Sequence, residues 1–299
     1  QNVEQYEVGM PFVRNYAPKD YKAFSQNWGM VQDSRGVLYF ANGDGVLEYD
    51  GVRWKLIRII NKYVACAIAI DQKDKIYVGS SSEFGYLYYS REGELKYRSL
   101  LDKTGFKPEK FNYVRGIFIV KSGVYFWAED KLFRWNGSKL KSWNMKRTER
   151  CFKYCDNILL WKKNTGLRYI KNDSIQKVRG GEFFIGKNVF NVLEYKENKI
   201  LVVTVDSGMY LMSDPFKLRA NAYPVQTKFY NQADYYIEHN QLLYCTRLNN
   251  GNYAFSTLRG GTAIIDAKGT LVQIIDSKSG LQNETHNSLG QDKQNALWI

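Results

Sequence analysis

The sequence contains little proline, cysteine and histidine, which account for 5, 4 and 2 of its 299 residues respectively. The two histidines, His239 and His286, have no cysteine or aspartate nearby at metal-ligand spacing, so neither a zinc site nor a histidine-based catalytic centre is indicated. No apolar run approaches the roughly 18–20 residues that a membrane-spanning helix needs. Because the chain starts at Gln1 rather than Met, we expect a processed form or a fragment, with any signal peptide or membrane anchor outside it.

The few cysteines are not placed to form a disulfide. Cys151 and Cys155 lie four residues apart in a segment with the pattern of a strand, which puts their Cα atoms roughly 13 Å apart. A disulfide needs about 5–6 Å between Cα atoms, so this pair should not bond. We therefore expect all four cysteines to be buried free thiols: Cys66, Cys151, Cys155 and Cys245.

Helical periodicity is also almost absent, since no stretch of about 12 residues carries apolar residues at positions i, i+3, i+4 and i+7. Aromatic residues, in contrast, are abundant: they make up 15% of the chain and include 23 tyrosines. They occur in short apolar or alternating runs separated by turns rich in Gly, Asn, Asp and Lys. Because such residues suit a half-buried pleated surface, the pattern predicts an all-β protein.

One sequence repeat that predicts four strands, which we call the word, recurs along the chain. Its clearest copy, residues 27–57, reads as a strand, a D-x-x-G turn, a strand ending in aromatics, a glycine turn and two further strands. With the turn before the second strand as anchor, the copies recur at a mean spacing of about 43 residues. There are six full copies and the start of a seventh: 27–57, 63–100, 112–143, 148–178, 188–215, 242–275 and 287–299.

Four strands in about 43 residues is the size of one propeller blade, which buries its two faces against neighbouring blades. The sequence therefore predicts a single domain over residues 1–299: a seven-bladed β-propeller of four-stranded antiparallel blades, with the last blade incomplete in this chain. A strand from residues 8–17 could complete part of that blade, although it cannot supply both missing strands.

The word D-x-x-G-x-L-[WY]-[FVI], followed by G-[VL]-x-x-[YF]-[DN]-G, resembles the two-component regulator propeller repeat. It is carried by DSRGVLYFANGDGVLEYDG (33–51), by DQKDKIYVGS with GYLYYS, and by DKQNALWI at the end of the chain. The stretch GMPFVRNYAPKDYKAFSQNWGMVQD (9–33) is similar to the start of the subgroup in which a triple-tyrosine domain follows the propeller.

This resemblance implies a non-catalytic ligand-sensing domain of a bacterial signal-transduction and transcription regulator. The domain would be periplasmic, as the ectodomain of an inner-membrane protein, and the full-length receptor would be a homodimer. Its ligand would be a small molecule or an oligosaccharide, and any membrane segment or kinase or DNA-binding output would lie outside this chain. Two alternatives remain open: a propeller glycoside hydrolase or lyase, and a protein-interaction scaffold.

Other motifs give no sign of chemistry. The segment GEFFIGKN (181–188) falls one residue short of a phosphate-binding loop, because Asn188 stands where that loop needs Ser or Thr, and strands rather than a helix follow. The Asp turns also resemble the Asp boxes of sialidases, and we expect the Asp to receive turn amides in a structural role. NGDG (42–45) lacks the later acidic ligands of a calcium loop. We therefore expect no catalytic residue, no metal site and no cofactor.

The net charge of +13 is concentrated in one region. Between Lys131 and Lys187 there are 15 Lys and Arg against 4 Asp and Glu, an excess of +11. No nucleic-acid-binding motif accompanies this excess, so no nucleic acid is expected to bind this domain. A solvated basic face is the favoured interpretation, and an attraction for an acidic ligand or partner is the alternative.

The remaining candidate is a recognition surface over the central axis. It is formed by the loops that lead into the innermost strands and by the loops between the second and third strands. Aromatic faces suit sugar C–H surfaces, and Arg and Asn suit hydroxyls and carboxylates, so we predict a carbohydrate site, with an acidic oligosaccharide matching the basic third and fourth repeats. The candidate residues are Trp28, Tyr63, Tyr113, Arg115, Arg150, Tyr235 and His286 in the first set of loops, and Asn42, Glu83, Glu129, Asp206 and Arg259 in the second.

Overall fold

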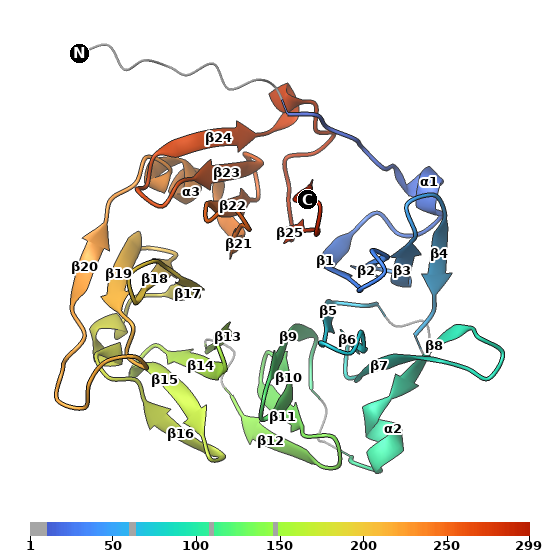
Figure 1. The fold of residues 1–299 in the computed structure, drawn as a ribbon, viewed down its shortest axis with the longest axis horizontal. Coiled ribbons are helices and arrows are strands. Elements are labelled where there is room, and N and C mark those ends of the chain that lie inside the picture. Colours follow the sequence, from blue (N-terminus) through green and yellow to red (C-terminus); the bar gives the residue numbers. More distant parts are fainter. Residues whose placement is uncertain (1–10, 60–63, 108–110, 146–148) are drawn as a thin grey trace.

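The computed structural model describes residues 11–59, 64–107, 111–145 and 149–299. Within these ranges, six four-stranded sheets stand in a ring around a central axis (Figure 1). The chain forms the sheets in sequence order, and the first strand of each lies nearest the axis. This arrangement is a β-propeller, and the prediction of an all-β fold with four-stranded antiparallel blades is confirmed.

The first three blades follow one another without a crossover. The first blade consists of β1 (Asn27–Gln32), β2 (Leu38–Asn42), β3 (Gly45–Tyr49) and β4 (Trp54–Ile57). The second consists of β5 (Ala67–Ile70), β6 (Ile76–Gly79), β7 (Phe84–Tyr89) and β8 (Leu95–Ser99). The third consists of β9 (Val114–Val120), β10 (Gly123–Ala128), β11 (Lys131–Trp135) and β12 (Leu140–Asn144).

The last three blades keep the same order of strands. The fourth consists of β13 (Arg150–Tyr154), β14 (Asn157–Lys162), β15 (Gly166–Lys171) and β16 (Ser174–Lys177). The fifth consists of β17 (Val189–Glu194), β18 (Lys199–Thr204), β19 (Met209–Ser213) and β20 (Gln226–Phe229). The sixth consists of β21 (Leu242–Arg247), β22 (Tyr253–Thr257), β23 (Thr262–Ile265) and β24 (Leu271–Ile275). The fifth blade thus extends beyond the range 188–215 expected for its repeat.

The prediction of seven blades is wrong. The seventh copy of the repeat forms only a two-stranded sheet, β25 (Gly290–Gln291) with β26 (Leu297–Trp298), and the described part of the chain holds six complete blades. A blade needs four paired strands to cover both of its neighbours, whereas this copy of the word stops after its second strand. Residues 11–17, the described part of the segment considered for completing this blade, form no strand.

The β25–β26 sheet lies between the sixth and first blades (Figure 1). Towards the sixth blade, the amide N–H of Asn249 donates to Oε1 of Gln291 at 2.7 Å. Towards the first blade, the amide N–H of Lys293 donates to Oε1 of Gln32 at 2.8 Å. The small sheet therefore links the two ends of the row of blades.

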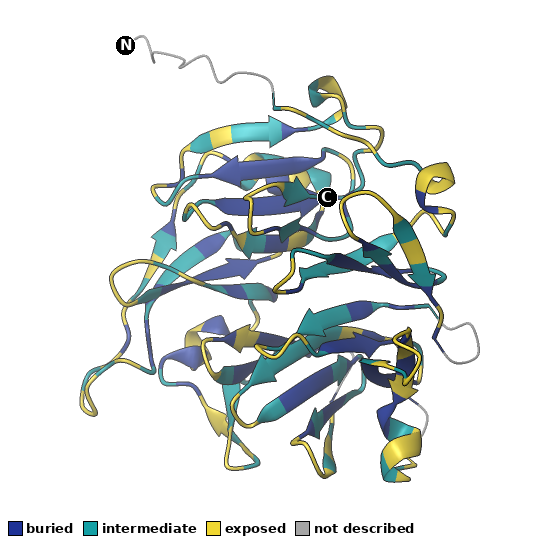
Figure 2. Cartoon of the chain, turned by 45° about the vertical axis from the view of Figure 1, so that its right-hand side comes forward, coloured by how far each residue is buried: buried dark blue, intermediate teal, exposed yellow. Residues whose placement is uncertain are grey.

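The core lies between the blades, and the second strands are its most buried parts (Figure 2). Every residue of β2, β6 and β22 is buried, because neighbouring blades cover both faces of these strands. Aromatic rings fill the spaces between blades: the Phe84 and Phe126 rings stack with their centroids 4.4 Å apart. The Trp298 ring likewise lies 5.3 Å from that of Phe40 and stacks on Tyr16 at 5.7 Å.

Aspartates hold the turns of the repeat word. Oδ1 of Asp33 accepts hydrogen bonds from the backbone N–H groups of Arg35 at 2.9 Å and Val37 at 3.0 Å. Asp71 and Asp292 each accept the equivalent pair of turn amides. The predicted structural role of these aspartates is therefore confirmed.

Short helices occupy the connections between blades, which the sequence patterns did not reveal. They are α1 (Pro18–Tyr21), α2 (Leu100–Thr104), η2 (Gly181–Phe184), α3 (Asp234–Asn240) and η3 (Ser277–Ser279). None of the helices in the described ranges is long and apolar enough to cross a membrane. The longest, α3, precedes the sixth blade and shapes the site described below.

All four cysteines are free thiols, but their expected burial holds for only two of them. Cys151 and Cys245 are buried between blades, Cys66 is half-buried and Cys155 is exposed. Cys155 lies in the turn after β13, where its backbone adopts a φ of 48° and its Sγ donates to Oε1 of Glu194 at 3.5 Å.

Candidate functional site

The predicted recognition loops lie together on one face, which we call the axial face. It consists of the connections between consecutive blades and the loops between the second and third strands of each blade. Main-chain hydrogen bonds join the two sets: the N–H of Val114 donates to the carbonyl of Ser80 at 3.0 Å, and that of Val205 to the carbonyl of Asn188 at 2.9 Å. Residues that are distant in the sequence can therefore form one surface.

Two of the candidate residues are buried and serve the fold. The side-chain amide of Asn42 donates to the carbonyl of Phe24 at 2.7 Å and so fixes the approach to β1. Oε1 of Glu83 accepts from the Tyr97 hydroxyl at 3.0 Å and from Oγ of Ser99 at 2.9 Å. Burial raises the pKa of Glu83, and the two hydrogen bonds oppose that rise.

His286 is buried as well, and both of its ring nitrogens have partners. Its Nε2 lies 3.0 Å from the carbonyl of Asn283, and its Nδ1 lies 2.8 Å from Oγ1 of Thr262. A carbonyl can only accept, so Nε2 carries the proton and Nδ1 accepts from the threonine hydroxyl. Burial lowers the pKa of His286 and favours this neutral form. His286 therefore supports the structure and does not face a ligand.

Three other candidate residues lie together on the axial face: Arg115 and Glu129 form an ion pair, and Tyr113 lies next to it. Nη2 of Arg115 lies 2.5 Å and Nε 3.0 Å from Oε1 of Glu129. The same guanidinium lies 5.5 Å from the ring centre of Tyr113, which is exposed. These polar and aromatic groups are accessible to a ligand, although the ion pair already uses part of the hydrogen-bonding capacity of Arg115 and Glu129.

The remaining candidates are dispersed. Trp28 is half-buried in β1, Arg150 begins β13, and Arg259 is exposed in the loop between β22 and β23. Tyr63 lies outside the described residues. Asp206 and Tyr235, by contrast, belong to one region of the axial face, where a pocket opens between the β18–β19 loop and α3.

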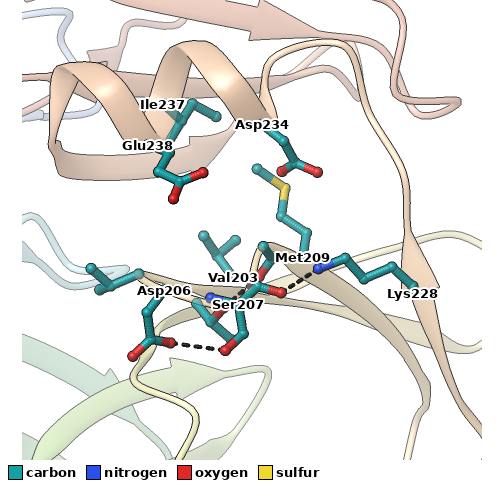
Figure 3. Close-up of a pocket in the computed structure, with 11 residues that line it drawn as sticks. Val203, Asp206, Ser207, Met209, Lys228, Asp234, Ile237 and Glu238 are labelled. Atoms are coloured by element: carbon teal, nitrogen blue, oxygen red, sulfur yellow. Dashed lines mark hydrogen bonds between the residues drawn. The ribbon is translucent and has the colours of Figure 1, made fainter.

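This pocket, which we call the α3 pocket, has a volume of about 290 Å³ (Figure 3). Its floor is the β18–β19 loop, and its opposite wall is one face of α3. The residues that line it are Val203, Thr204, Val205, Asp206, Ser207, Gly208, Met209, Lys228, Asp234, Ile237 and Glu238.

The floor of the α3 pocket is a tightly bonded turn. Oγ1 of Thr204 donates to the carbonyl of Gly208 at 2.6 Å and accepts from the N–H of Ser207 at 3.0 Å. Gly208 has a φ of +68°, and a Cβ there would lie 2.5 Å from Nζ of Lys228. That Nζ donates to the carbonyl of Ser207, so the lysine is fixed at the edge of the pocket. A residue with a side chain at this position would hold an unfavourable backbone conformation and would displace the lysine ammonium group.

The wall of the pocket carries two carboxylates from the same face of α3. Asp234 and Glu238 are four residues apart, about one helical turn, and both side chains point towards the β18–β19 loop (Figure 3). Burial raises the pKa of Asp234, and the Glu238 charge raises it further; a hydrogen bond from Asn231 and the Lys228 charge oppose the rise. Asp206 adds a third carboxylate from the floor.

The chemistry of the α3 pocket is that of hydrogen-bond acceptors next to apolar surface. Carboxylates accept from hydroxyl and ammonium groups, while Val203, Met209 and Ile237 offer contact area to a ligand's C–H surfaces. Tyr235, which follows Asp234 in α3 but does not line the pocket, is 73% exposed and lies against the ring of His239. No group of three or more His, Cys, Asp or Glu among the described residues could hold a metal ion.

The sequence predictions missed most of this pocket. Of its polar lining residues, only Asp206 was a candidate, whereas Lys228, Asp234 and Glu238 were not. The segment DYYIEHN (234–240) does place two acidic residues four apart, which is a helical signal, but it is too short to stand out. Lys228 lies in the outermost strand β20, and no sequence pattern connects it with the β18–β19 loop.

Part of the basic charge between Lys131 and Lys187 is used within the fold. Arg134 and Lys141 both pair with Asp173, the latter with 3.1 Å between Nζ and Oδ2. Nη1 of Arg179 donates to three backbone carbonyls, those of Arg219, Ala220 and Ala222. The charge excess therefore overstates the free positive surface of the third and fourth blades.

No protein-family model and no curated protein sequence matches the chain. Among solved structures, it is similar to the extracellular domain described as part of the hybrid two-component system BT4673 from B. thetaiotaomicron, with a TM-score of 0.61 and 17% identity. That match covers 91% of this chain and 36% of the other, so this chain spans about a third of the length of that domain.

Two propellers of other kinds are similarly close in fold. A streptogramin B lyase matches with a TM-score of 0.60 and 10% identity over 91% of this chain and 89% of its own. The WD40 β-propeller domain of Doa1 matches with a TM-score of 0.60 and 12% identity over 92% of both chains. At these identities, the likenesses show the propeller fold alone.

Proposed function

We propose that this chain is a non-catalytic, ligand-sensing domain of an extracytoplasmic signal-transduction protein, and that it binds a neutral or amine-bearing oligosaccharide in the α3 pocket. The observation that carries this proposal is the pocket itself. It brings Asp206, Asp234 and Glu238 together on the axial face, and the exposed Tyr235 directly follows Asp234 in α3.

The composition of the pocket decides which sugars fit. Its three carboxylates and one ammonium group leave it with net negative charge, so it disfavours uronates and sulfated sugars and favours hydroxyls or an amino group. The acidic ligand expected from the basic repeats therefore does not suit this pocket. Tyr235 offers the aromatic face that a sugar ring commonly packs against, and its ring is already held by His239, with 3.7 Å between ring centroids.

The sensor part of the proposal is supported by architecture. The chain shares its fold with an extracellular domain of a two-component system, and the repeat word of the sequence resembles that of sensor propellers. In such a receptor, a ligand transmits a signal only through its different affinities for two arrangements of the protein. We propose that the full-length protein is a homodimer and that this ligand-dependent rearrangement occurs between its two propellers.

Isothermal titration calorimetry against a panel of neutral, amine-bearing and uronate-bearing oligosaccharides tests the proposal. We expect a neutral or amine-bearing sugar to bind, and the double variant Asp234→Asn, Glu238→Gln to weaken that binding at least tenfold, because charged acceptors make the stronger hydrogen bonds. The matched control is Glu182→Gln, which changes an exposed carboxylate outside the pocket.

Three outcomes would contradict the proposal. If no sugar binds, or if the double variant binds as well as the wild type, the α3 pocket is not an oligosaccharide site. If the bound sugar is cleaved, as chromatography of the incubated mixture would show, the domain is a propeller hydrolase or lyase. If no sugar binds but a protein partner does, the scaffold alternative holds.

A further inference from the structure

Arg150, which lies in the inner strand β13, differs from Arg115 and Arg134 in its surroundings. It is the first residue of β13, and its side chain extends over the next inner strand, β17, where its guanidinium carbon lies 4.7 Å from the ring centre of Phe190. Its charge also acts on the thiol of Cys245 in β21 and lowers the pKa of that group, against the larger effect of burial. Arg150 and Phe190 thus bring side chains of two neighbouring inner strands together, β13 and β17, and β21 is the inner strand of the next blade (Figure 1).

This guanidinium has no anionic partner in the described part of the chain. Arg115 pairs with Glu129 and Arg134 with Asp173, whereas Arg150 forms neither a hydrogen bond nor an ion pair there. Its neighbour in sequence, Glu149, has its own cation, since Nζ of Lys162 lies 3.0 Å from its Oε1.

Arg150 is also half-buried. Burial lowers the pKa of Arg150, and an electrostatic interaction with Cys245 opposes this effect. Withdrawing a cation from water without a counter-charge is unfavourable, so such groups normally pair or bind an anion. A guanidinium presents N–H groups in a fork that matches the oxygens of a carboxylate, sulfate or phosphate.

We propose that Arg150 is the centre of an anion-binding site at the inner strands β13, β17 and β21, which takes a small molecule that presents an oxyanion. Phe190 holds the guanidinium plane, and the anion supplies the oxygen acceptors that the described residues do not. This site is separate from the α3 pocket, since Arg150 does not line that pocket, and it does not depend on the proposed oligosaccharide function.

Titration calorimetry of the whole chain in a low-salt buffer tests the proposal. The probes are sodium D-glucuronate, sodium sulfate and sodium phosphate, which separate carboxylate from tetrahedral oxyanions, with D-glucose as the neutral control. We expect at least one of the anions to bind with a dissociation constant in the millimolar range, and glucose not to compete with it. Arg150→Gln should weaken the binding at least tenfold, while Arg150→Lys should keep part of it because it retains the charge.

The matched control is Arg259→Gln, which removes one exposed arginine of the axial face and should leave anion affinity unchanged. Thermal unfolding of each variant establishes that it is folded before titration. The proposal is overturned if none of the three anions binds to the wild type, or if Arg150→Gln binds as tightly as the wild type. It is also overturned if Arg259→Gln weakens binding as much as Arg150→Gln, since the attraction would then be that of the net charge alone.

Discussion

The indole Nε1 of Trp298 donates a hydrogen bond to Oδ2 of Asp292, 2.9 Å away. The hydroxyl of Tyr39 has the same relation to Oδ2 of Asp33, at 3.3 Å. In both cases the aromatic residue follows the aspartate by six positions, and Oδ1 stays available for the turn amides. One carboxylate therefore joins the turn between the first and second strands to the aromatic residue of the second strand.

Asp33→Ala should lower the free energy of unfolding by about 2–3 kcal/mol, because it leaves buried donors without an acceptor. The Asp33 side chain is 2% exposed, so water cannot replace it. Urea denaturation of wild type and variant measures the difference. Glu92→Ala, in an exposed turn, is the control and should change stability by less than about 0.5 kcal/mol. Equal losses in the two variants would contradict the structural role of Asp33.

His286 should make the protein less stable in mild acid. Its pKa is lowered from 6.5 by burial, so below about pH 6.5 the unfolded chain binds a proton that the folded chain does not. Stability contributed by the neutral imidazole is therefore present above that pH and is lost as the pH falls. His286→Gln should flatten this dependence between pH 7 and pH 5. His239→Gln, which changes the exposed second histidine, should leave it intact, and identical profiles for the two variants would refute the assignment.

Glu83 should give the opposite dependence of stability on pH. Burial raises its pKa above 4.5, so above that pH the folded chain retains a proton that the unfolded chain has released. Stability from the protonated carboxyl is therefore lost as the pH rises from about 4.5 through the raised pKa. Over this pH range, the free energy of unfolding of Glu83→Gln should increase relative to that of the wild type. Glu197→Gln, at an exposed position, should show no such gain; a flat difference for Glu83→Gln would contradict the prediction.

Gly208→Ala should damage the α3 pocket more than the fold. The added Cβ would lie 2.5 Å from Nζ of Lys228, and the alanine would have to adopt a φ of +68°. We expect a loss of about 1–2 kcal/mol in stability from the backbone conformation. Calorimetry should also show weaker sugar binding, because Lys228 must leave its position at the pocket edge. Gly251→Ala, in a turn where the nearest atom to an added Cβ is 3.7 Å away, shares the backbone cost but should preserve binding.

The sequence alone determined the local architecture of this protein. In the first, second and seventh copies of the word, a turn aspartate lies only six positions before an aromatic residue, as for Asp33 and Tyr39, which are in contact. Strand number, strand order and the turn-capping role of the aspartates follow from such short-range contacts. The copy count alone suggested seven blades, yet a copy becomes a blade only when all four of its strands pair, and within the described residues that pairing occurs in six copies.

Which residues come together in the α3 pocket could not be predicted from the sequence, because it depends on contacts between separate elements. Asp206, Lys228 and Asp234 come from a loop, an outer strand and a helix, and the pairing of β18, β19 and β20, with α3 opposite the β18–β19 loop, brings them to one pocket. The tertiary structure likewise showed that Asn42, Glu83 and His286 are turned inwards, and that Arg150 has no counter-ion within the described chain. These features depend on burial and on contacts between separate segments, which hydrophobic period and turn chemistry do not specify.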